Sequence, residues 1–472
     1  MNKHFDILVQ EVLDFAQKSI LEKTVDSKQL RKDLDPLSLQ KKLALATTSK
    51  GLSNQEMIEL INQIIDHSVV TNHPLFMNQM FGKTQAISYL ADILIALLNT
   101  SMYTYEVAPV FSLIEKKVVE NLGEKIWGIG NGDGVFTAGG SMSNMNALFL
   151  ARQNYQEQIK QQGLFNEKPF AIFVSEQAHY SFTKGVNFLG FGLDSLIKVK
   201  SNKDATINVE ALKKAIIQAK KEGRVPLLLV GIAGTTISGS YDDLGSLAQI
   251  AKEHQMWYHV DAAYGGSLLF SEREKNRLKG IENADSVGWN FHKIMGMSLS
   301  TSSFLTKEKG QLNKAFNVDA GYLFHEETED FDLGKKSLRG GRRPDAFKLW
   351  LSWKYQGDIG FSKHVENLRD TSLLMANLIE NDPSLELFNT PHSTIVCFRY
   401  VSKDKSLVES DALNKQIRNQ IFKEGKIIFN YATLNKATYL RCVILDPEMT
   451  KKQVKLILDR VVEVGKQMEQ KN

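Results

Sequence analysis

The sequence predicts an α/β protein built on a large, mostly parallel sheet. Through the middle of the chain, short apolar runs rich in β-forming residues alternate with amphipathic helical segments, as they do in βαβ units. Residues before and after this region follow other patterns, so smaller units are expected on both sides. A chain of 472 residues is long enough for about three structural units.

The amino-terminal segment is expected to be helical because its apolar residues recur on one stripe. Phe5, Leu8, Val12 and Phe15 follow a helical period, and Met57–Ile65 repeats that period loosely. More helix is expected between residues 83 and 122, with an interruption near Asn99–Pro109. We assign residues 1–72 to an N-terminal helical segment.

Residues 73–369 are assigned to the large domain that carries the sheet. A helix is predicted from Asn208, an N-cap type of residue, to Glu222, where Gly223 stops it. Ligands of parallel sheets bind beyond the carboxyl ends of the strands, so chemistry is sought there. The candidate strands are Ala171–Ser175, Leu196–Val199, Leu227–Ala233, Trp257–Val260 and Ser286–Trp289.

Residues 370–472 are expected to form a small α+β domain. The pattern there reads helix, strand, helix, strand and a final helix over Lys451–Lys466. No stretch rich in Pro, Gly or Ser separates this domain from the large one.

Composition excludes several classes of protein. Apolar residues make up 43% of the chain and the formal net charge is only +4, without a basic block suited to nucleic acid. The longest mostly apolar stretch, Ala86–Leu98, is too short to span a membrane and contains Asp92. No signal-peptide pattern is seen, and Cys397 and Cys442 imply no disulfide framework. We therefore expect a soluble cytoplasmic protein with no nucleic-acid, membrane or metal partner.

A glycine-rich segment, Gly132–Asn144, precedes a predicted helix at Met145–Ile159. Glycines let a backbone approach a ligand closely, and free N–H groups with Ser side chains at a helix start suit a phosphate. Taken alone, the segment is better explained by an ordinary glycine turn followed by a Ser or Asn N-cap. It matches neither the P-loop nor the dinucleotide pattern.

Three further residues follow apolar runs. Asp261 could hold a heteroaromatic nitrogen protonated, or simply cap the next turn. Lys293, directly after His292, could form a Schiff base, although most lysines lie in surface turns. His179 alone is more typical of a structural histidine. Together, a phosphate cup, a flat side chain, an acid and an amine describe a pyridoxal phosphate site, in which the protonated ring is the electron sink.

With these motifs in place, the sequence resembles the group II pyridoxal-phosphate-dependent amino-acid decarboxylases, which include glutamate, aromatic-amino-acid and cysteine-sulfinate decarboxylases. The resemblance extends from about His73 to Pro447. It implies the aspartate-aminotransferase-like (type I) fold with a seven-stranded, mostly parallel sheet, and a homodimer with active sites at the interface. The stretches that carry it are HPLFMNQ, TYEVAPVF, GDGVFTAGGSMSNMNALFLAR, HVDAAYGG, NFHK and GRRPDAFKLWLSW.

The resemblance also implies the site. Lys293 would bind the cofactor covalently, Asp261 would pair with the pyridine nitrogen, and His179 would stack on the ring. Arg441 matches an arginine that holds a substrate carboxylate. The other implied cofactor-binding residues are Met142, Ser143, Thr235, Ala263, Asn290 and His292.

The implied reaction is decarboxylation of a small acidic L-amino acid through an external aldimine and a quinonoid. GYLF, DLGKKSLRGGRRPDAFKLW and NTSMYTYE look like the acidic-amino-acid branch. Gln79, Phe81 and Tyr103 are the implied substrate-binding residues, with Arg441. Aromatic residues at 81 and 103 resemble the cysteine-sulfinate and aspartate enzymes, and a bulky Phe81 would shorten the pocket against glutamate.

One departure from the family concerns a loop expected near His325–Lys336. Related decarboxylases often use a loop tyrosine to reprotonate Cα, and Phe331 stands at the corresponding position here. His179 or water would then supply the proton. Two alternatives follow: an aldehyde-forming or transaminating relative, and a catalytically degenerate homologue, against which the intact Lys293, Asp261 and His179 argue.

Overall fold

The computed structural model describes residues 29–470 except 33–34, 44, 48, 166, 319–323, 325–329 and 403–404, together with 9–10, 13–14 and 17. Its large sheet has seven strands in the order β1-β7-β6-β5-β4-β2-β3, and β7 runs in the direction opposite to the other six. The strands are β1 (Asp133–Thr137), β2 (Phe170–Ser175), β3 (Leu196–Val199), β4 (Val225–Ile232), β5 (Trp257–Asp261), β6 (Ser286–Asn290) and β7 (Ser302–Thr306).

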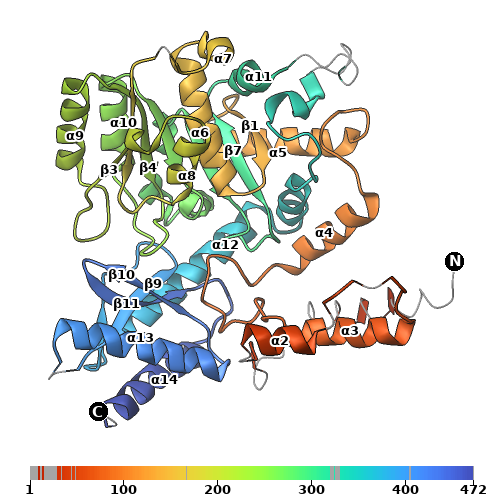
Figure 1. Cartoon of the computed structure of the whole chain (residues 1–472), viewed down its shortest axis with the longest axis vertical. Helices are drawn as coiled ribbons and strands as arrows, with labels where there is room; N and C mark the ends of the chain where they lie inside the picture. Colours follow the sequence, from red (N-terminus) through yellow and green to blue (C-terminus); the bar gives the residue numbers. More distant parts are fainter. Residues whose placement is uncertain are drawn as a thin grey trace.

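Helices cover both faces of this sheet (Figure 1). Side chains alternate across each strand, so Val135, Ile172 and Val230 pack with α6, α8 and α11, whereas Phe173 and Val260 face α5, α9, α10 and α12. These helices are α5 (Pro109–Trp127), α6 (Gly140–Tyr155), α8 (Ser181–Phe188), α9 (Val209–Lys221), α10 (Leu244–Glu253), α11 (Gln311–Phe316) and α12 (Ala346–Glu380).

The carboxyl-terminal part forms a second, antiparallel sheet in the order β10-β11-β9-β8. The long helix α12 runs from the large sheet to this small one, so the expected boundary after residue 369 lies inside a helix that both units share (Figure 1). The elements are β8 (Leu385–Leu387), β9 (Ile395–Tyr400), β10 (Asn430–Leu434), β11 (Ala437–Val443), α13 (Leu407–Glu424) and α14 (Lys451–Glu469).

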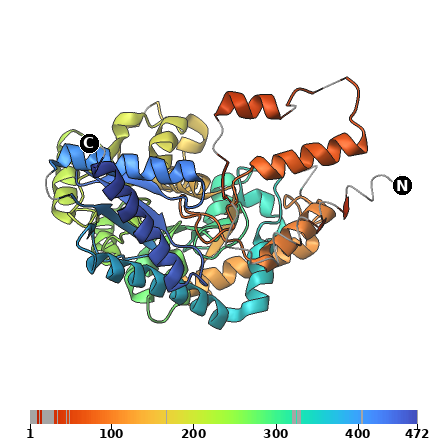
Figure 2. The same cartoon turned by 90° about the horizontal axis from the view of Figure 1, so that it is seen from below.

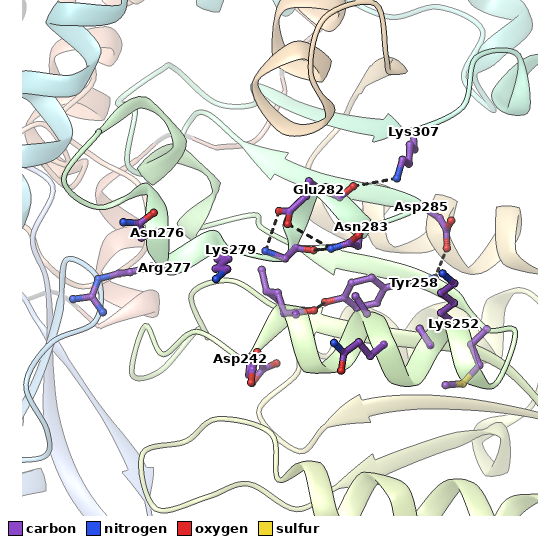
Figure 3. A pocket seen from close by; sticks show the side chains of 18 of the residues that line it. Asp242, Lys252, Tyr258, Asn276, Arg277, Lys279, Glu282, Asn283, Asp285 and Lys307 are labelled. Carbon is purple, nitrogen blue, oxygen red and sulfur yellow. Dashed lines mark hydrogen bonds between the residues drawn. The ribbon is translucent and has the colours of Figure 1, made fainter.

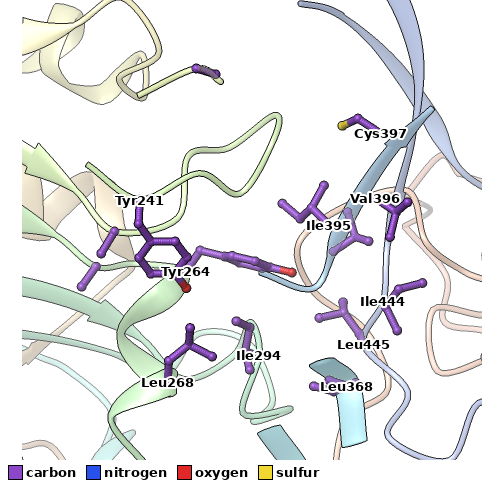
Figure 4. Packing of buried hydrophobic residues seen from close by; sticks show 14 of the residues in the cluster. Tyr241, Tyr264, Leu268, Ile294, Leu368, Ile395, Val396, Cys397, Ile444 and Leu445 are labelled. Atoms are coloured by element: carbon purple, nitrogen blue, oxygen red, sulfur yellow. The ribbon is translucent and has the colours of Figure 1, made fainter. Parts of the chain in front are cut away.

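One hydrophobic core joins the two units. Figure 4 shows Tyr264 and Leu268, which follow β5, beside Ile395 and Val396 of β9 and Leu368 of α12. All five side chains are buried. Burial of apolar surface on this scale holds the small sheet in a fixed position over the large one, so that residues from both can share a site.

The amino-terminal helices stand apart from this core. Figure 2 shows α2 (Pro36–Lys42) and α3 (Asn54–His67) projecting away from the body, and neither contains a buried residue. A capping box between Ser53 and Glu56 starts α3. Further elements are α4 (Ala86–Leu98), α7 (Ile159–Gln162), η1 (Leu193–Ser195), η2 (Gly265–Phe270), η3 (Lys275–Leu278), η4 (Ile281–Asn283) and η6 (Leu333–Lys336).

The α/β fold class and all five candidate strands are confirmed. Asn208 caps α9 as predicted, because its side chain accepts from the N–H of Ala211 at 2.8 Å. The helix expected at Met145–Ile159 begins earlier, at Gly140, and ends at Tyr155. Within the described part of the chain, none of the helices has the length and apolar character needed to cross a membrane.

Candidate active site

The carboxyl edge of the large sheet brings together Lys293, Asp261 and His179. Lys293 lies in the turn after β6, and burial lowers the pKa of its ammonium group to about 8, against a partial opposing effect of Asp261. Arg441, from the small sheet, is close enough to lower that pKa further. An amine with such a pKa is partly neutral near physiological pH and can act as a nucleophile.

Asp261 ends β5 and is buried. Its two carboxylate oxygens accept hydrogen bonds from Asn144 Nδ2 at 2.8 Å and from the N–H of Ala263 at 3.1 Å. Two donors hold the carboxylate in one orientation at the end of the strand. The bond from Ala263 caps the turn after β5, and the second donor, Asn144, fixes the carboxylate where it could also face a cationic ligand atom.

His179 lies in the turn after β2, half-buried. The N–H of Ser181 donates to His179 Nδ1 at 3.2 Å, and Ser181 Oγ lies 2.8 Å from the same nitrogen. Burial lowers the pKa of this imidazole, with a smaller raising effect from Asp261. The ring is therefore neutral near pH 7 and carries its proton on Nε2.

The glycine-rich segment forms a hollow at the start of α6. A Cβ on Gly140 would lie 2.8 Å from Asn290 Nδ2 and 3.4 Å from the Cβ of Ala263, so only glycine leaves this space open. Asn290 Oδ1 is buried without a hydrogen-bond partner. The first N–H groups of a helix also lack internal acceptors. The open space at Gly140 and these N–H donors fit a bound phosphate group, whereas Asn290 Oδ1 is an acceptor and calls for a donor instead.

Ser143, which was predicted to bind the phosphate in this hollow, uses its hydroxyl for other contacts. The hydroxyl of Ser143 bonds Thr137 Oγ1 at 2.9 Å and donates to the carbonyl of Ser303 at 3.1 Å. The N–H groups of Met142 and Ser143 both reach the carbonyl of Gly139. Ser141, which the sequence analysis did not select, is exposed at the helix start.

Two other predicted cofactor residues have their polar atoms bound within the protein. The Thr235 hydroxyl lies 2.8 Å from Ser238 Oγ and accepts from the N–H of Ser240, which shapes the turn after β4. His292 Nδ1 accepts from the N–H of Thr301 at 3.1 Å, and burial lowers the imidazole pKa to about 4. Both therefore support the loops around Lys293 and Asp261.

Arg441 is a buried cation without a carboxylate partner among the described residues. It lies in β11, and its guanidinium donates to three carbonyls: Ile237 at 3.1 Å, Asn78 at 3.2 Å and Thr236 at 2.6 Å. Carbonyl dipoles position the group but do not neutralise its charge. A small carboxylate or sulfinate could provide that neutralisation.

The predicted substrate-binding residues Gln79, Phe81 and Tyr103 lie in different surroundings. Asn78, held by Arg441, brings the following segment to the site, where Gln79 is exposed and the half-buried ring of Phe81 lies 6.0 Å from that of Phe76. Tyr103 is half-buried and its ring lies 5.3 Å from that of Phe324.

The loop that carries Phe331 packs on the large unit. The ring of Phe331 lies 5.4 Å from the ring of Tyr105, and Lys116 Nζ lies 4.2 Å from its centre. Asp332 accepts from the N–H of Tyr105, and Lys336 pairs with Asp133 at 2.8 Å. Residues 325–329 of the predicted loop lie outside the described residues.

Sequence reasoning missed Asn144, Ser181 and His259. Asn144 bridges Asp261 and Ser181, and its Oδ1 lies 3.2 Å from His259 Nε2. One signal was available: in β5 the alternation of a strand places His259 and Asp261 on the same face. Which helix residues meet that face could not be read from the pattern.

Another hollow lies at the opposite end of these strands. Figure 3 shows a surface cavity of about 1030 Å³ at the amino ends of β5 and β6, lined by charged residues. Lys307 Nζ donates to the carbonyl of Glu282 at 3.2 Å, and Asp285 accepts from the N–H of Tyr258 at 2.7 Å. None of the residues predicted for the site lines this cavity.

Known proteins are similar to this chain over most of its length. Residues 36–401 match the family model described as the pyridoxal-dependent decarboxylase conserved domain. The acidic amino acid decarboxylase GADL1 of Homo sapiens is 34% identical over 92% of this chain and 85% of its own length. The cysteine sulfinic acid decarboxylase of Mus musculus is 35% identical over 98% of this chain and 97% of its own.

Solved structures of other proteins share the fold of this chain. The crystal structure of mouse CSAD in apo form superimposes with a TM-score of 0.93, at 33% identity, and covers 98% of this chain and 99% of that one. A structure of Oryza sativa TDC with PLP and tryptamine, at 20% identity and a TM-score of 0.89, shares the fold.

Proposed function

This chain belongs to the pyridoxal-dependent decarboxylase family, and from that premise we propose that it decarboxylates a small acidic L-amino acid, aspartate or cysteine sulfinate in preference to glutamate. The observation that carries the proposal is Arg441, a buried guanidinium beside Lys293 that has no carboxylate partner in the described part of the chain. The relatives named for acidic substrates support the same substrate class.

The residues present fit pyridoxal phosphate. The hollow at Gly140, with the first N–H groups of α6, would hold the phosphate, and Lys293 would hold the aldehyde carbon through its amine. Asp261 would face the pyridine nitrogen, and His179 and Ala263 would lie on opposite faces of the ring. When bound, the cofactor supplies an electron sink for the pair left by departing carbon dioxide.

Each nearby side chain then has a defined task. Asp261, fixed by two donors, would keep the proton on the ring nitrogen because its negative charge stabilises the cationic form. His179 carries a proton on Nε2, which it would deliver to the substrate Cα, while a proton from solvent would reach Nδ1 through the Ser181 hydroxyl so that the ring stays neutral. Lys293 would release the product by taking back its place on the cofactor.

The substrate would be bound by its distal acid group. Arg441 would pair with that group in a bidentate fashion, while the carbonyls of Ile237 and Thr236 keep the guanidinium in place. Phe81 and Gln79 follow Asn78, which Arg441 also contacts. A bulky ring at Phe81 would leave room for a shorter acid and disfavour glutamate.

The test is a substrate panel. Purified protein with added pyridoxal phosphate is offered aspartate, cysteine sulfinate, glutamate and an aromatic amino acid separately, and amine and carbon dioxide are quantified. We expect the highest kcat/KM with aspartate or cysteine sulfinate. A higher kcat/KM with glutamate would contradict the role of Phe81, and turnover of the aromatic amino acid alone would contradict the role of Arg441.

Phe331 supports a second candidate, aldehyde formation. A phenylalanine has no proton to give, so slow protonation at Cα would leave the reacting carbon exposed to oxygen. Its ring is held against Tyr105 and Lys116. Measurement of hydrogen peroxide and ammonia in the same panel separates the two reactions: decarboxylation alone releases neither.

A homodimer would complete this site. Exposed apolar side chains gather on α4 and α5, and burial of such a patch favours association. The projecting α2 and α3 have no buried residues and would gain contacts from a second copy. Light scattering after gel filtration should give twice the mass of 53.2 kDa. The patch residues are Leu90, Ile93, Leu97, Leu98, Val110 and Leu113.

We place the protein in the cytoplasm. Cys397 and Cys442 are buried free thiols, as expected in a reducing compartment. Cell fractionation with an antibody against the chain would test the location, and recovery with a membrane fraction after a salt wash would contradict it.

A further inference from the structure

A continuous series of hydrogen bonds runs beneath the candidate active site, between the sheet and two helices. It begins at Trp257 Nε1, which donates to Ser286 Oγ at 2.8 Å. Ser286 Oγ lies 2.9 Å from His259 Nδ1, and His259 Nε2 lies 3.2 Å from Asn144 Oδ1. From Asn144 Nδ2 the series divides, to Asp261 Oδ2 at 2.8 Å and to Ser181 Oγ at 3.0 Å.

The hydrogen bond at the tryptophan end favours one direction of donation along the series. An indole N–H can only donate, so Ser286 Oγ accepts from Trp257 and keeps its own proton for another acceptor. His259 Nδ1 is the acceptor within reach. A neutral imidazole that accepts at Nδ1 carries its proton on Nε2.

The carboxylate end requires the same direction. Asp261 can only accept when ionised, so Asn144 must turn its amide nitrogen toward that carboxylate. Asn144 Oδ1 then faces His259 and needs a donor, which is Nε2–H. The carboxylate end therefore specifies the tautomer of His259, and the donor at the tryptophan end reinforces it.

Through Ser181, the same direction of hydrogen-bond donation extends to His179. Ser181 Oγ accepts from Asn144 and so has its own proton free for His179 Nδ1, which lies 2.8 Å away. The N–H of Ser181 donates to the same nitrogen. His179 is thereby left with its proton on Nε2.

The surroundings keep His259 neutral and in place. Its side chain is fully buried, and burial lowers the imidazole pKa to about 4. The rings of Phe182 and Phe304 lie 6.3 and 6.0 Å from it. A Cβ on Gly288 would lie 3.6 Å from His259 Cε1 and 3.2 Å from the Cβ of Ser143, so glycine gives the series its space.

We propose that His259 is a positioning residue for the decarboxylase reaction: through Asn144 it orients the Asp261 carboxylate and sets the proton of His179 on Nε2. This role rests on the proposed function. It gives one buried histidine control of both the group expected at the cofactor nitrogen and the group expected to donate the proton.

The experiment compares His259→Phe with His259→Gln. Phenylalanine fills the ring volume but leaves Asn144 Oδ1 without its donor and the Ser286 hydroxyl proton without its acceptor, whereas the glutamine amide can replace Nε2–H as donor to Asn144. Pyridoxal phosphate Kd, kcat, KM and the unfolding midpoint of each apoprotein are measured. We expect H259F to raise the Kd and to lower kcat by about tenfold or more, and H259Q to stay within about threefold of wild type.

Two results would overturn the proposal. In the first, H259F leaves Kd and kcat within about twofold of wild type. In the second, H259Q loses as much kcat and cofactor affinity as H259F. That result would show that the imidazole ring itself is required and that its N–H donor is not. Retention of substrate KM in H259F is expected, because Arg441 is untouched.

A second pair of variants keeps the test valid if H259F fails to fold. Trp257→Phe removes the donor that reinforces this order, and Trp289→Phe removes the same kind of bond, from Trp289 Nε1 to Ser267 Oγ at 3.2 Å, outside the series. W257F should lower kcat more than W289F at a similar loss of thermal stability. Equal loss of kcat in both would contradict the proposal.

Failure of the proposed function would look different. Wild-type protein that binds pyridoxal phosphate but decarboxylates no acidic amino acid would contradict the function alone. The Kd values of H259F and H259Q would still decide whether His259 orients Asp261.

Discussion

The two ends of β5 and β6 differ in how their polar groups are satisfied. At the amino ends, the cavity of Figure 3 is large, but Asp285 and Lys307 bond neighbouring backbone groups. At the carboxyl ends, Arg441 has no carboxylate partner in the described chain and Asn290 Oδ1 has no partner. Unsatisfied buried polar groups, rather than the size of a hollow, mark the end of the sheet where a ligand belongs.

The largest expected effect is at the carboxyl edge. Replacement of Lys293 by alanine removes the amine whose pKa burial lowers to about 8. We expect turnover and the visible absorbance of the lysine-bound cofactor to disappear, because no other nucleophile takes its place. Spectra and amine release are measured together, and turnover that persists without the absorbance would contradict the assignment.

A smaller effect is expected from Arg441→Lys. A lysine keeps the charge but loses the planar fork, so kcat/KM for aspartate should fall about 10- to 100-fold. The pyridoxal phosphate Kd should change by less than about twofold, because the guanidinium bonds only carbonyls of the protein. Equal weakening of substrate and cofactor binding would show that Arg441 supports the whole site instead.

The pH dependence of cofactor capture sharpens the comparison further. Only the neutral amine of Lys293 attacks an aldehyde, and burial lowers its pKa from 10.5 to about 8. The capture rate of apoprotein should therefore rise about tenfold per pH unit at low pH and level off above pH 8. Stopped-flow absorbance measures it, and a rate that rises without a break to pH 10 would indicate an ordinary exposed lysine.

The smallest effect is predicted for the amino edge. Asp285→Asn keeps an acceptor for the N–H of Tyr258 but loses the charge that strengthens this bond. The free energy of unfolding should fall by about 1 kcal/mol, and kcat and KM should stay unchanged. Thermal unfolding measures the stability, and a decarboxylation assay measures kcat and KM. A large loss of turnover would mean that the cavity of Figure 3 contributes to catalysis.

The fold was predictable where a strand is apolar along its whole length. β2, β4, β5 and β6 are mostly buried and contain apolar runs, and β3 at one edge was also predicted, whereas β1 and β7 at the other end of the sheet were harder. β7, Ser302–Thr306, is rich in hydroxyl groups, and β1 lies inside the glycine-rich segment. Their burial comes from pairing with β6 and with each other, which no local pattern reports.

The site was predictable to the level of strand ends. Asp261 and Lys293 were selected because they follow apolar runs, and the structure places them near each other. The orientation of Ser143, whose hydroxyl bonds Thr137, depends on a neighbouring strand. Asn144 and His259 meet only because α6 packs on β5, so their connection appeared only in three dimensions.

Reductive trapping tests the central claim most directly. Protein saturated with pyridoxal phosphate is treated with borohydride, which makes the bond between the cofactor and its lysine permanent, and the modified peptide is identified by mass spectrometry. The account predicts modification at Lys293, at the carboxyl edge of the sheet. Modification instead at Lys252, Lys279 or Lys307, which line the cavity at the amino edge, would contradict it.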